Sequence, residues 1–217
     1  MSMRGGRRVR LLGACVLLTG GIGGSALLTG TAGAATCVAG AACSMTGTAA
    51  LGAGALNLTT PTALGWTTTL TGASQQVVDT TTADQSYTVN DATGSGAGWH
   101  VTVDATNFAN GAVTLPLTGT FSTNGSTGAA TATATTPPTQ ACTTTSDCTL
   151  PTNAITFPEA ITTAAATPPP TTIYDAAAAT GIGSVLISGV GWWLTLPGTT
   201  AAGTYTSTVD MDIVSAP

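Results

Sequence analysis

The feature that most limits how this chain can fold is a hydrophobic pattern with a period of two. In its clearest stretch, from Tyr205 to Ile213, the odd-numbered residues are mostly apolar and the even-numbered residues are Thr or Asp. Successive side chains point to opposite faces of a β-strand, so this stretch predicts a half-buried strand. No stretch has the 3.6-residue period of an amphipathic helix. Similar alternation occurs in residues 64–70, 87–91, 99–105, 113–121 and 186–196.

Several short strands separated by glycine-rich breaks predict an all-β fold. We expect an antiparallel β-sandwich of the immunoglobulin-like or Greek-key type. In the stretch that begins at Leu186, the alternation places Val190 and Trp192 on the same face as Leu186. Long loops rich in Thr, Ala and Pro interrupt the pattern, and we expect the largest to be an insertion at residues 122–152.

The N-terminus has the three parts of a secretory signal peptide. Residues 1–10 carry all 4 arginines, residues 11–28 are mostly apolar, and Ala32 and Ala34 supply the small residues of a cleavage site. The alternative is an uncleaved membrane anchor, but the glycines between residues 20 and 30 make a poor spanning helix. We therefore expect cleavage after Ala34 and export, so that the protein is secreted or held at the cell surface.

Export would leave a chain without any cation. The 4 Lys and Arg residues all lie in the predicted signal peptide, whereas all 9 acidic residues follow it. A chain without cations cannot neutralise phosphates, which excludes nucleic acid and anionic membrane surfaces as partners. The lack of lysine also excludes Schiff-base chemistry and Lys–Asn isopeptide crosslinks.

The cysteines fit an oxidising compartment. Beyond the signal peptide they form two pairs with the same spacing, Cys37 with Cys43 and Cys142 with Cys148. Four cysteines allow three connectivities, and the matched spacing favours the two local bridges Cys37–Cys43 and Cys142–Cys148. The alternative is a zinc site, but zinc knuckles have closer cysteine spacing.

The sequence thus predicts three segments along the chain. They are a signal peptide at 1–34, a disulfide-bearing strap at 35–53, and a β-domain at 54–217 that contains the insertion at 122–152.

Two passages of the β-domain carry a family resemblance. Residues 87–103 include Gly98-Trp99-His100-Val101, and residues 193–213 end in Met211-Asp212-Ile213. Together they resemble the WxL domain, a surface module of Gram-positive bacteria, and especially its actinobacterial relatives. The resemblance implies an all-β extracellular domain that binds peptidoglycan non-covalently. Val101 stands where the first motif has Leu, and Met211-Asp212-Ile213 stands where the second has Trp-x-Leu.

The tryptophans supply the candidate binding residues. Trp192 and Leu194 take one face of their predicted strand and leave Trp193 on the other, so an outward Trp193 would offer a platform for a ligand. The alternatives are that Trp193 lies between two sheets or that a loop covers its ring. Trp99 shares a face with Val101 and is either a core residue or a ring that stacks on a sugar. The full candidate set for wall binding is Trp193, Trp99, Val101, Trp192, Met211 and Ile213.

Catalytic signals are weak. His100 is the only histidine, and its phase turns it away from the face of Trp99. Asp210 and Asp212 lie about 7 Å apart on one face of a strand, a separation compatible with an inverting glycosidase or part of a calcium site. Solvated carboxylates that guard a sheet edge are the alternative. We expect no catalysis, no metal and no cofactor.

These observations predict an exported, non-catalytic surface protein whose partner is peptidoglycan or another neutral wall glycan. After export the chain would carry 9 acidic residues and no Lys or Arg, so anionic wall polymers would repel it. The first alternative is a structural or adhesive protein that binds other surface proteins through its β-edges. The second is a secreted carbohydrate-active enzyme.

Overall fold

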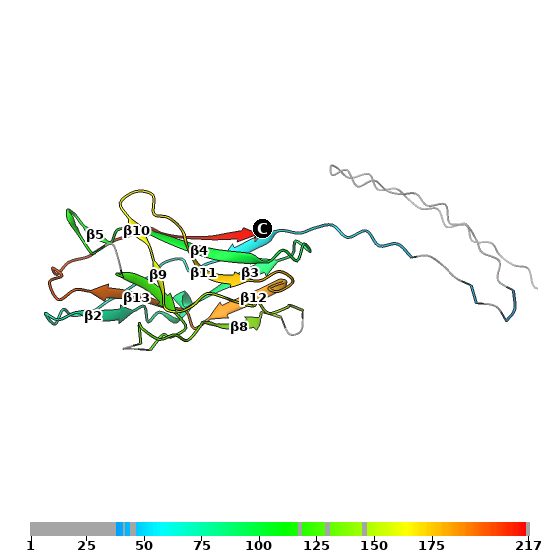
Figure 1. The fold of residues 1–217 in the computed structure, drawn as a ribbon, viewed down its shortest axis with the longest axis horizontal. Coiled ribbons are helices and arrows are strands. Elements are labelled where there is room, and N and C mark those ends of the chain that lie inside the picture. The colour runs from blue at the N-terminus through cyan, green and yellow to red at the C-terminus, as the bar shows by residue number, and fades with distance from the viewer. Residues whose placement is uncertain are drawn as a thin grey trace, which may run out of the picture. The chain divides into compact units, whose positions relative to one another are not determined.

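Antiparallel β-strands make up nearly all the regular structure in the described part of the chain (Figure 1). The computed structural model describes residues 38–40, 42–43, 47–116, 119–128, 131–144 and 147–215. Residues 50–217 form one unit, and the described residues before Ala50 belong to another. The predicted signal peptide lies outside the described residues.

Helical structure is nearly absent from the described part of the chain. Its one helix is the 3-10 turn η1 (Thr82–Asp84). None of the described helical residues forms a helix long and apolar enough to cross a membrane.

The first layer of the sandwich is the sheet around β4 (Trp99–Thr106), the upper layer in Figure 1. On one edge β4 pairs with β14 (Val209–Ser215), and on the other with β11 (Thr171–Ala176) and β10 (Thr163–Ala164). Every pair is antiparallel except that of β10 with β4, which is parallel. In its pairing with β4, β14 brings a segment from the C-terminal end of the chain against one that lies about a hundred residues earlier.

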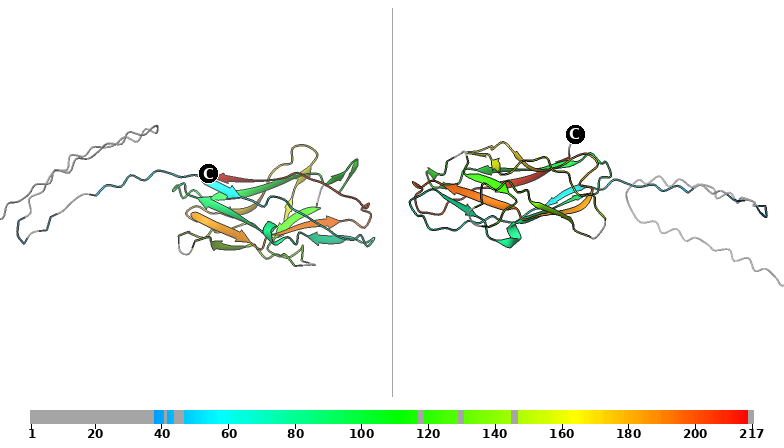
Figure 2. Two further views of the ribbon diagram at one scale, coloured as in Figure 1. Left: turned by 180° about the vertical axis from the view of Figure 1, so that it is seen from behind. Right: turned by 60° about the horizontal axis from the view of Figure 1, so that its bottom comes forward.

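Two further sheets form the second layer, seen below β4 in Figure 1 and from other sides in Figure 2. The strands of one sheet are, in spatial order, β1 (Leu56–Thr59), β3 (Ser86–Asp91), β12 (Gly183–Ser188) and β8 (Thr139–Cys142). The strands of the other are β2 (Gln75–Val78), β13 (Gly191–Leu196), β7 (Phe121–Asn124) and β9 (Glu159–Ile161). A small hairpin of β5 (Ala109–Asn110) and β6 (Val113–Thr114) lies apart from both.

The core lies between the layers and follows the predicted alternation. The alternate residues Trp99, Val101 and Val103 of β4 are buried against Trp192 and its neighbours from the other layer. Burial of large apolar and aromatic side chains supplies most of the stabilisation of such a sandwich. The all-β sandwich predicted from the sequence is therefore confirmed, while its immunoglobulin-like or Greek-key type stays a prediction.

Three local expectations are corrected by the structure. Residues 64–70 alternate but form no strand. The expected loop at 122–152 contains most of β7 and all of β8, because backbone pairing with β13 and β12 builds strands from Ser- and Thr-rich sequence that has no apolar stripe. Leu186 does not share the core face of Trp192: Ile187 does, because the chain between β12 and β13 turns at Gly189 with φ +70° and shifts the phase by one residue.

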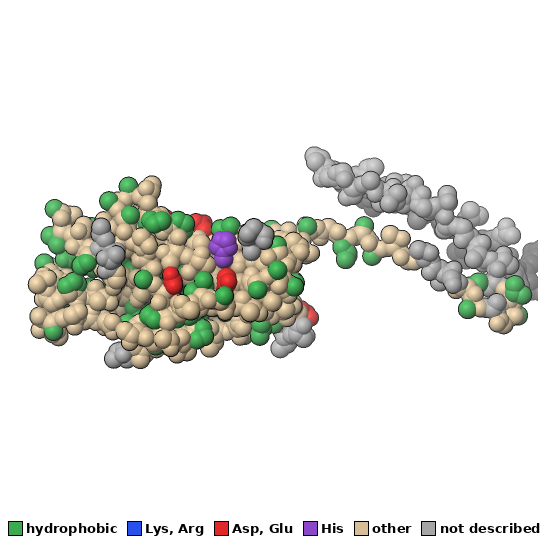
Figure 3. Space-filling view, in the orientation of Figure 1, with side chains coloured by type: hydrophobic (Ala, Val, Ile, Leu, Met, Phe, Trp, Pro, Cys, Tyr) green, Lys and Arg blue, Asp and Glu red, His purple; other side chains and the backbone are tan. Residues whose placement is uncertain are grey.

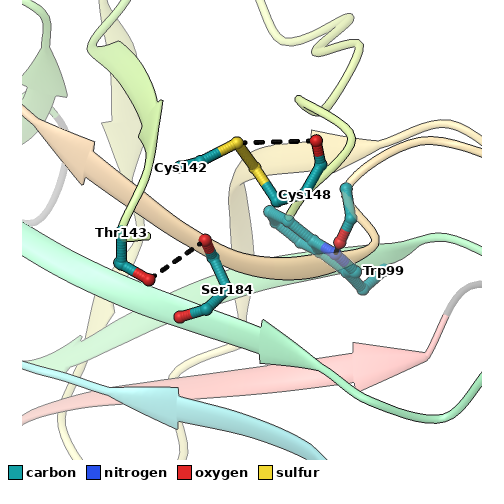
Figure 4. The surroundings of a disulfide bond; sticks show 6 residues. Trp99, Cys142, Thr143, Cys148 and Ser184 are labelled. Atoms are coloured by element: carbon teal, nitrogen blue, oxygen red, sulfur yellow. Dashed lines mark hydrogen bonds between the residues drawn. A yellow bond between two sulfur atoms is a disulfide. The ribbon is translucent and has the colours of Figure 1, made fainter. Parts of the chain in front are cut away.

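The predicted Cys142–Cys148 disulfide is present and fastens a loop to β12. Thr143 donates its backbone N–H to the Ser184 carbonyl at 3.0 Å, and Thr149 donates to the Ile182 carbonyl at 2.9 Å. Figure 4 shows the bridge beside Ser184, with Trp99 nearby. Cys43 is also disulfide-bonded, but Cys37, its predicted partner, lies outside the described residues.

Candidate functional site

Trp193, the leading candidate from the sequence, does not present its ring to solvent. Its side chain is fully buried with Val78 and Ala132 in a second, small core on the outer side of β13. The ring nitrogen donates to Asn124 Oδ1 at 3.0 Å and to the Ser126 carbonyl at 3.1 Å. The prediction of an outward platform is wrong, and the alternative that a loop covers the ring is correct.

The other tryptophans of the candidate set are also core residues. Trp99 and Trp192 are fully buried, as is Val101, so none of these three side chains reaches the surface. Trp99 donates its ring N–H to the Gly181 carbonyl at 2.8 Å and stacks on Tyr174 with ring centroids 6.3 Å apart. These contacts hold the Trp99 ring inside the protein, and its full burial leaves no ring face free for a sugar.

The structure does bring the two motif segments together. In the pairing of β4 with β14, Ile213 lies directly opposite Val101, and Met211 lies opposite Val103. The side chains of Met211 and Ile213 are partly buried against the main core. Met211 also lines a large cleft.

This threonine cleft, as we call it, has a volume of about 1170 Å³. One wall is the extended segment 60–70 that follows β1, and the other is the segment 200–207 that leads into β14. The apolar part of its lining, which we call the floor, includes Trp66, Phe108, Leu115, Leu194, Leu196 and Met211.

Trp66 holds the first wall in place. Its ring nitrogen donates to the Trp192 carbonyl at 2.9 Å, and its ring packs edge-on against Phe108 and Phe121. The preceding Gly65 donates its backbone N–H to the buried carboxylate of Asp79 at 2.7 Å. These bonds to neighbouring parts of the sandwich replace the strand pairing that residues 60–70 lack.

The chemistry of the threonine cleft is that of hydroxyls over an apolar floor. Threonines occur along both walls, with Tyr205 and Ser207 in the second wall, and none of the described residues that line the cleft is charged. The Tyr205 hydroxyl donates to the Ala201 carbonyl at 3.1 Å and so closes the turn of that wall. A surface of this kind suits a neutral ligand that has both hydroxyl and apolar groups.

Met211, which the sequence offered as a candidate for binding the cell wall, lines this cleft, whereas the cleft and its two sides were not predicted. Trp66 lies in one of the alternating stretches, residues 64–70, and Tyr205 was predicted to begin a strand. The signal that could have identified the two walls is the threonine-rich sequence near each aromatic residue. Thr67-Thr68-Thr69 follows Trp66, and Thr199-Thr200 precedes Tyr205. Aromatic residues near runs of threonine are consistent with a solvent-accessible surface that presents hydroxyl groups to a ligand.

A group of acidic residues lies outside the cleft, on the outer face of the β4 sheet. Asp210 and Asp212 of β14 are exposed there, and Asp210 lies directly opposite Asp104 on β4. Partial burial, followed by repulsion from Asp210 and Asp212, raises the pKa of the Asp104 carboxyl. No group of three or more potential metal ligands occurs among the described residues.

His100 lies on the same outer face and is half-buried. Its neighbours across the sheet are Asp175 on β11 and Val214 on β14. Figure 3 shows the single histidine on an otherwise mostly uncharged surface, with a few acidic side chains around it.

Comparison with known proteins adds nothing to this geometry. No protein-family model, no curated protein and no solved structure matches the chain.

Proposed function

We propose that this chain is an exported, non-catalytic surface protein that binds peptidoglycan non-covalently through a WxL-like β-domain, with the threonine cleft as its contact surface. The observation that carries the proposal is the lining of the cleft, which combines hydroxyl walls, an apolar floor and no charge. Wall glycan is a neutral polymer with many hydroxyls, and recognition of such a polymer needs this combination rather than cations.

The family resemblance supports the same assignment. The two passages that resemble the WxL motifs become neighbouring strands, and Met211 of the second passage contributes to the cleft. The location outside the cell rests on the signal peptide at 1–34 and on a disulfide of the kind that persists in oxidising compartments.

The absence of cations from the described residues favours neutral peptidoglycan over anionic wall polymers. The carboxylates of Asp210 and Asp212 lie on the outer face of β14 and do not line the cleft, which supports a binding role over glycoside hydrolysis.

Co-sedimentation of the purified, oxidised protein with peptidoglycan stripped of anionic polymers tests the proposal. Ala202→Trp fills the cleft from its exposed wall, and Ala166→Trp places the same side chain on an exposed loop outside it. We expect saturable pelleting of the wild-type protein and of Ala166→Trp, and weakened pelleting of Ala202→Trp. A folded wild-type protein that stays in the supernatant would refute wall binding.

A second candidate is a structural or adhesive protein that binds other surface proteins through a β-edge. The observation in its favour is that β14 pairs only with β4 among the described strands, which leaves its other edge open. Open edges accept strands from partner proteins. Pelleting that depends on a co-purified surface protein rather than on peptidoglycan would favour this candidate.

A further inference from the structure

We propose that the threonine cleft recognises the acetamido groups of N-acetylhexosamine units through the open edge of β14. This inference rests on the proposed function, and it names which part of the wall polymer the cleft binds. An acetamido group has one N–H donor, one C=O acceptor and one methyl group. It therefore needs a polar amide edge beside an apolar surface, and the cleft supplies both.

The amide edge follows from the register of β14. Thr106 donates its backbone N–H to the Thr208 carbonyl at 2.8 Å, so the pair of these residues is bonded across the ladder. Bonded and non-bonded pairs alternate in an antiparallel ladder, and the next pair, Val209 with Ala105, is therefore non-bonded. The N–H and C=O of Val209 consequently point away from β4, as do those of Met211.

This open edge lies at the cleft. Val209 and Met211 both line it, together with Ser207 of the segment before β14. The facing wall, residues 60–70, belongs to no strand and does not close the edge by pairing. A ligand in the cleft thus meets unpaired peptide groups, which favour an amide-bearing partner over one with hydroxyls alone.

The floor accounts for the methyl group. Leu194, Leu196 and Met211 are apolar and partly or fully buried, and no charged residue stands among them. Burial of a methyl group against this apolar surface is favourable, whereas the sugar hydroxyls meet the threonine hydroxyls of the walls. A partner strand would satisfy the same edge but would leave most of the hydroxyl walls without matching groups, so the observations favour the glycan.

A matched pair of variants tests the edge directly. Val209→Pro removes both the valine side chain and the open-edge N–H, whereas Val209→Ala removes the side chain alone. Proline is tolerated on an edge strand where its nitrogen faces away from the ladder, so the bonds to β4 remain. Binding is measured by competition, with the tetramer of N-acetylglucosamine or the tetramer of glucose added to the protein and peptidoglycan.

We expect the N-acetylated tetramer to release the protein from peptidoglycan and the glucose tetramer to have no effect. We expect Val209→Pro to bind about fivefold more weakly than Val209→Ala, the loss that corresponds to one hydrogen bond. Equal affinities of the two variants, both shown to be folded by circular dichroism, would overturn the role of the edge.

Failure of the inference and failure of the proposed function give different results. If peptidoglycan pellets the protein but the N-acetylated tetramer does not compete, acetamido recognition is wrong and wall binding stands. If a short extended peptide competes instead, the edge accepts a strand and the inference is also wrong. If peptidoglycan does not pellet the folded protein and the tetramer does not bind by calorimetry, both fail together.

Discussion

At the scale of single residues, Trp193 shows how a tryptophan on the outer face of a sheet can be buried and contribute to stability instead of contacting a ligand. The chain after β7 folds back over β13, where a Cβ at Gly191 would collide with the Ser126 carbonyl oxygen. This close approach brings Asn124 and Ser126 to the ring nitrogen and Ala132 to the ring. A buried indole N–H needs such partners, and here it has two.

Replacement of Trp193 by Ala should therefore cost stability rather than binding alone. We expect the free energy of unfolding to fall by about 4 kcal/mol, the range for a fully buried tryptophan. Urea denaturation measures the change, with Thr167→Ala on an exposed loop as a control that should leave the midpoint unchanged. Unchanged stability of Trp193→Ala would show that the ring is not buried in solution.

At the scale of secondary-structure elements, the pairing of β4 with β14 carries an electrostatic cost. Asp210 and Asp104 lie directly opposite each other, and like charges in that position destabilise a sheet. Because the pKa of Asp104 is raised in the folded protein, its ionised form opposes folding at neutral pH. The cost is present above the raised pKa of Asp104 in the folded protein. It is lost as the pH falls through that pKa and below the ordinary pKa that Asp104 has in the unfolded chain.

Asp210→Asn should consequently stabilise the protein at neutral pH, by about 0.5 kcal/mol. The gain should shrink as the pH falls and Asp104 becomes protonated in the wild-type protein. Urea denaturation at neutral and acidic pH measures both effects, and Asp147→Asn in the disulfide loop provides the same charge change away from this pair. A gain that is equal for both variants would indicate a general charge effect instead.

The elements also show how far the sequence could predict this fold. The alternation in residues 87–91, 99–105 and 205–213 predicted β3, β4 and β14 with their correct buried faces, because one face of each packs on the core. β7 and β8 lack such a stripe, so their pairing depends on strands that are distant in the sequence. Residues 64–70 have the stripe without a partner strand. They are held instead by the ring N–H of Trp66, which donates to the Trp192 carbonyl, and by the backbone N–H of Gly65, which donates to the Asp79 carboxylate.

At the scale of the whole β-domain, the edge of β14 that faces away from β4 has no partner strand among the described residues. Residues 60–70, which follow β1, line the threonine cleft without joining any of the sheets. Sequence patterns predict which faces are buried, but a cleft arises where two distant segments fail to pair, and no local pattern reports that. Likewise, no local pattern reports that the chain after β7 covers Trp193, so the class of fold was predicted correctly and the platform at Trp193 was not.

The central claim is that the wall polymer occupies the threonine cleft, and hydrogen–deuterium exchange tests it most directly. The purified protein is compared with and without a saturating amount of soluble peptidoglycan fragments. We predict slower exchange in residues 60–70 and 203–211, including the open-edge amide of Val209, and unchanged exchange in β8 and in the loop over Trp193. Slower exchange confined to those other regions, or no change at saturation, would contradict the claim.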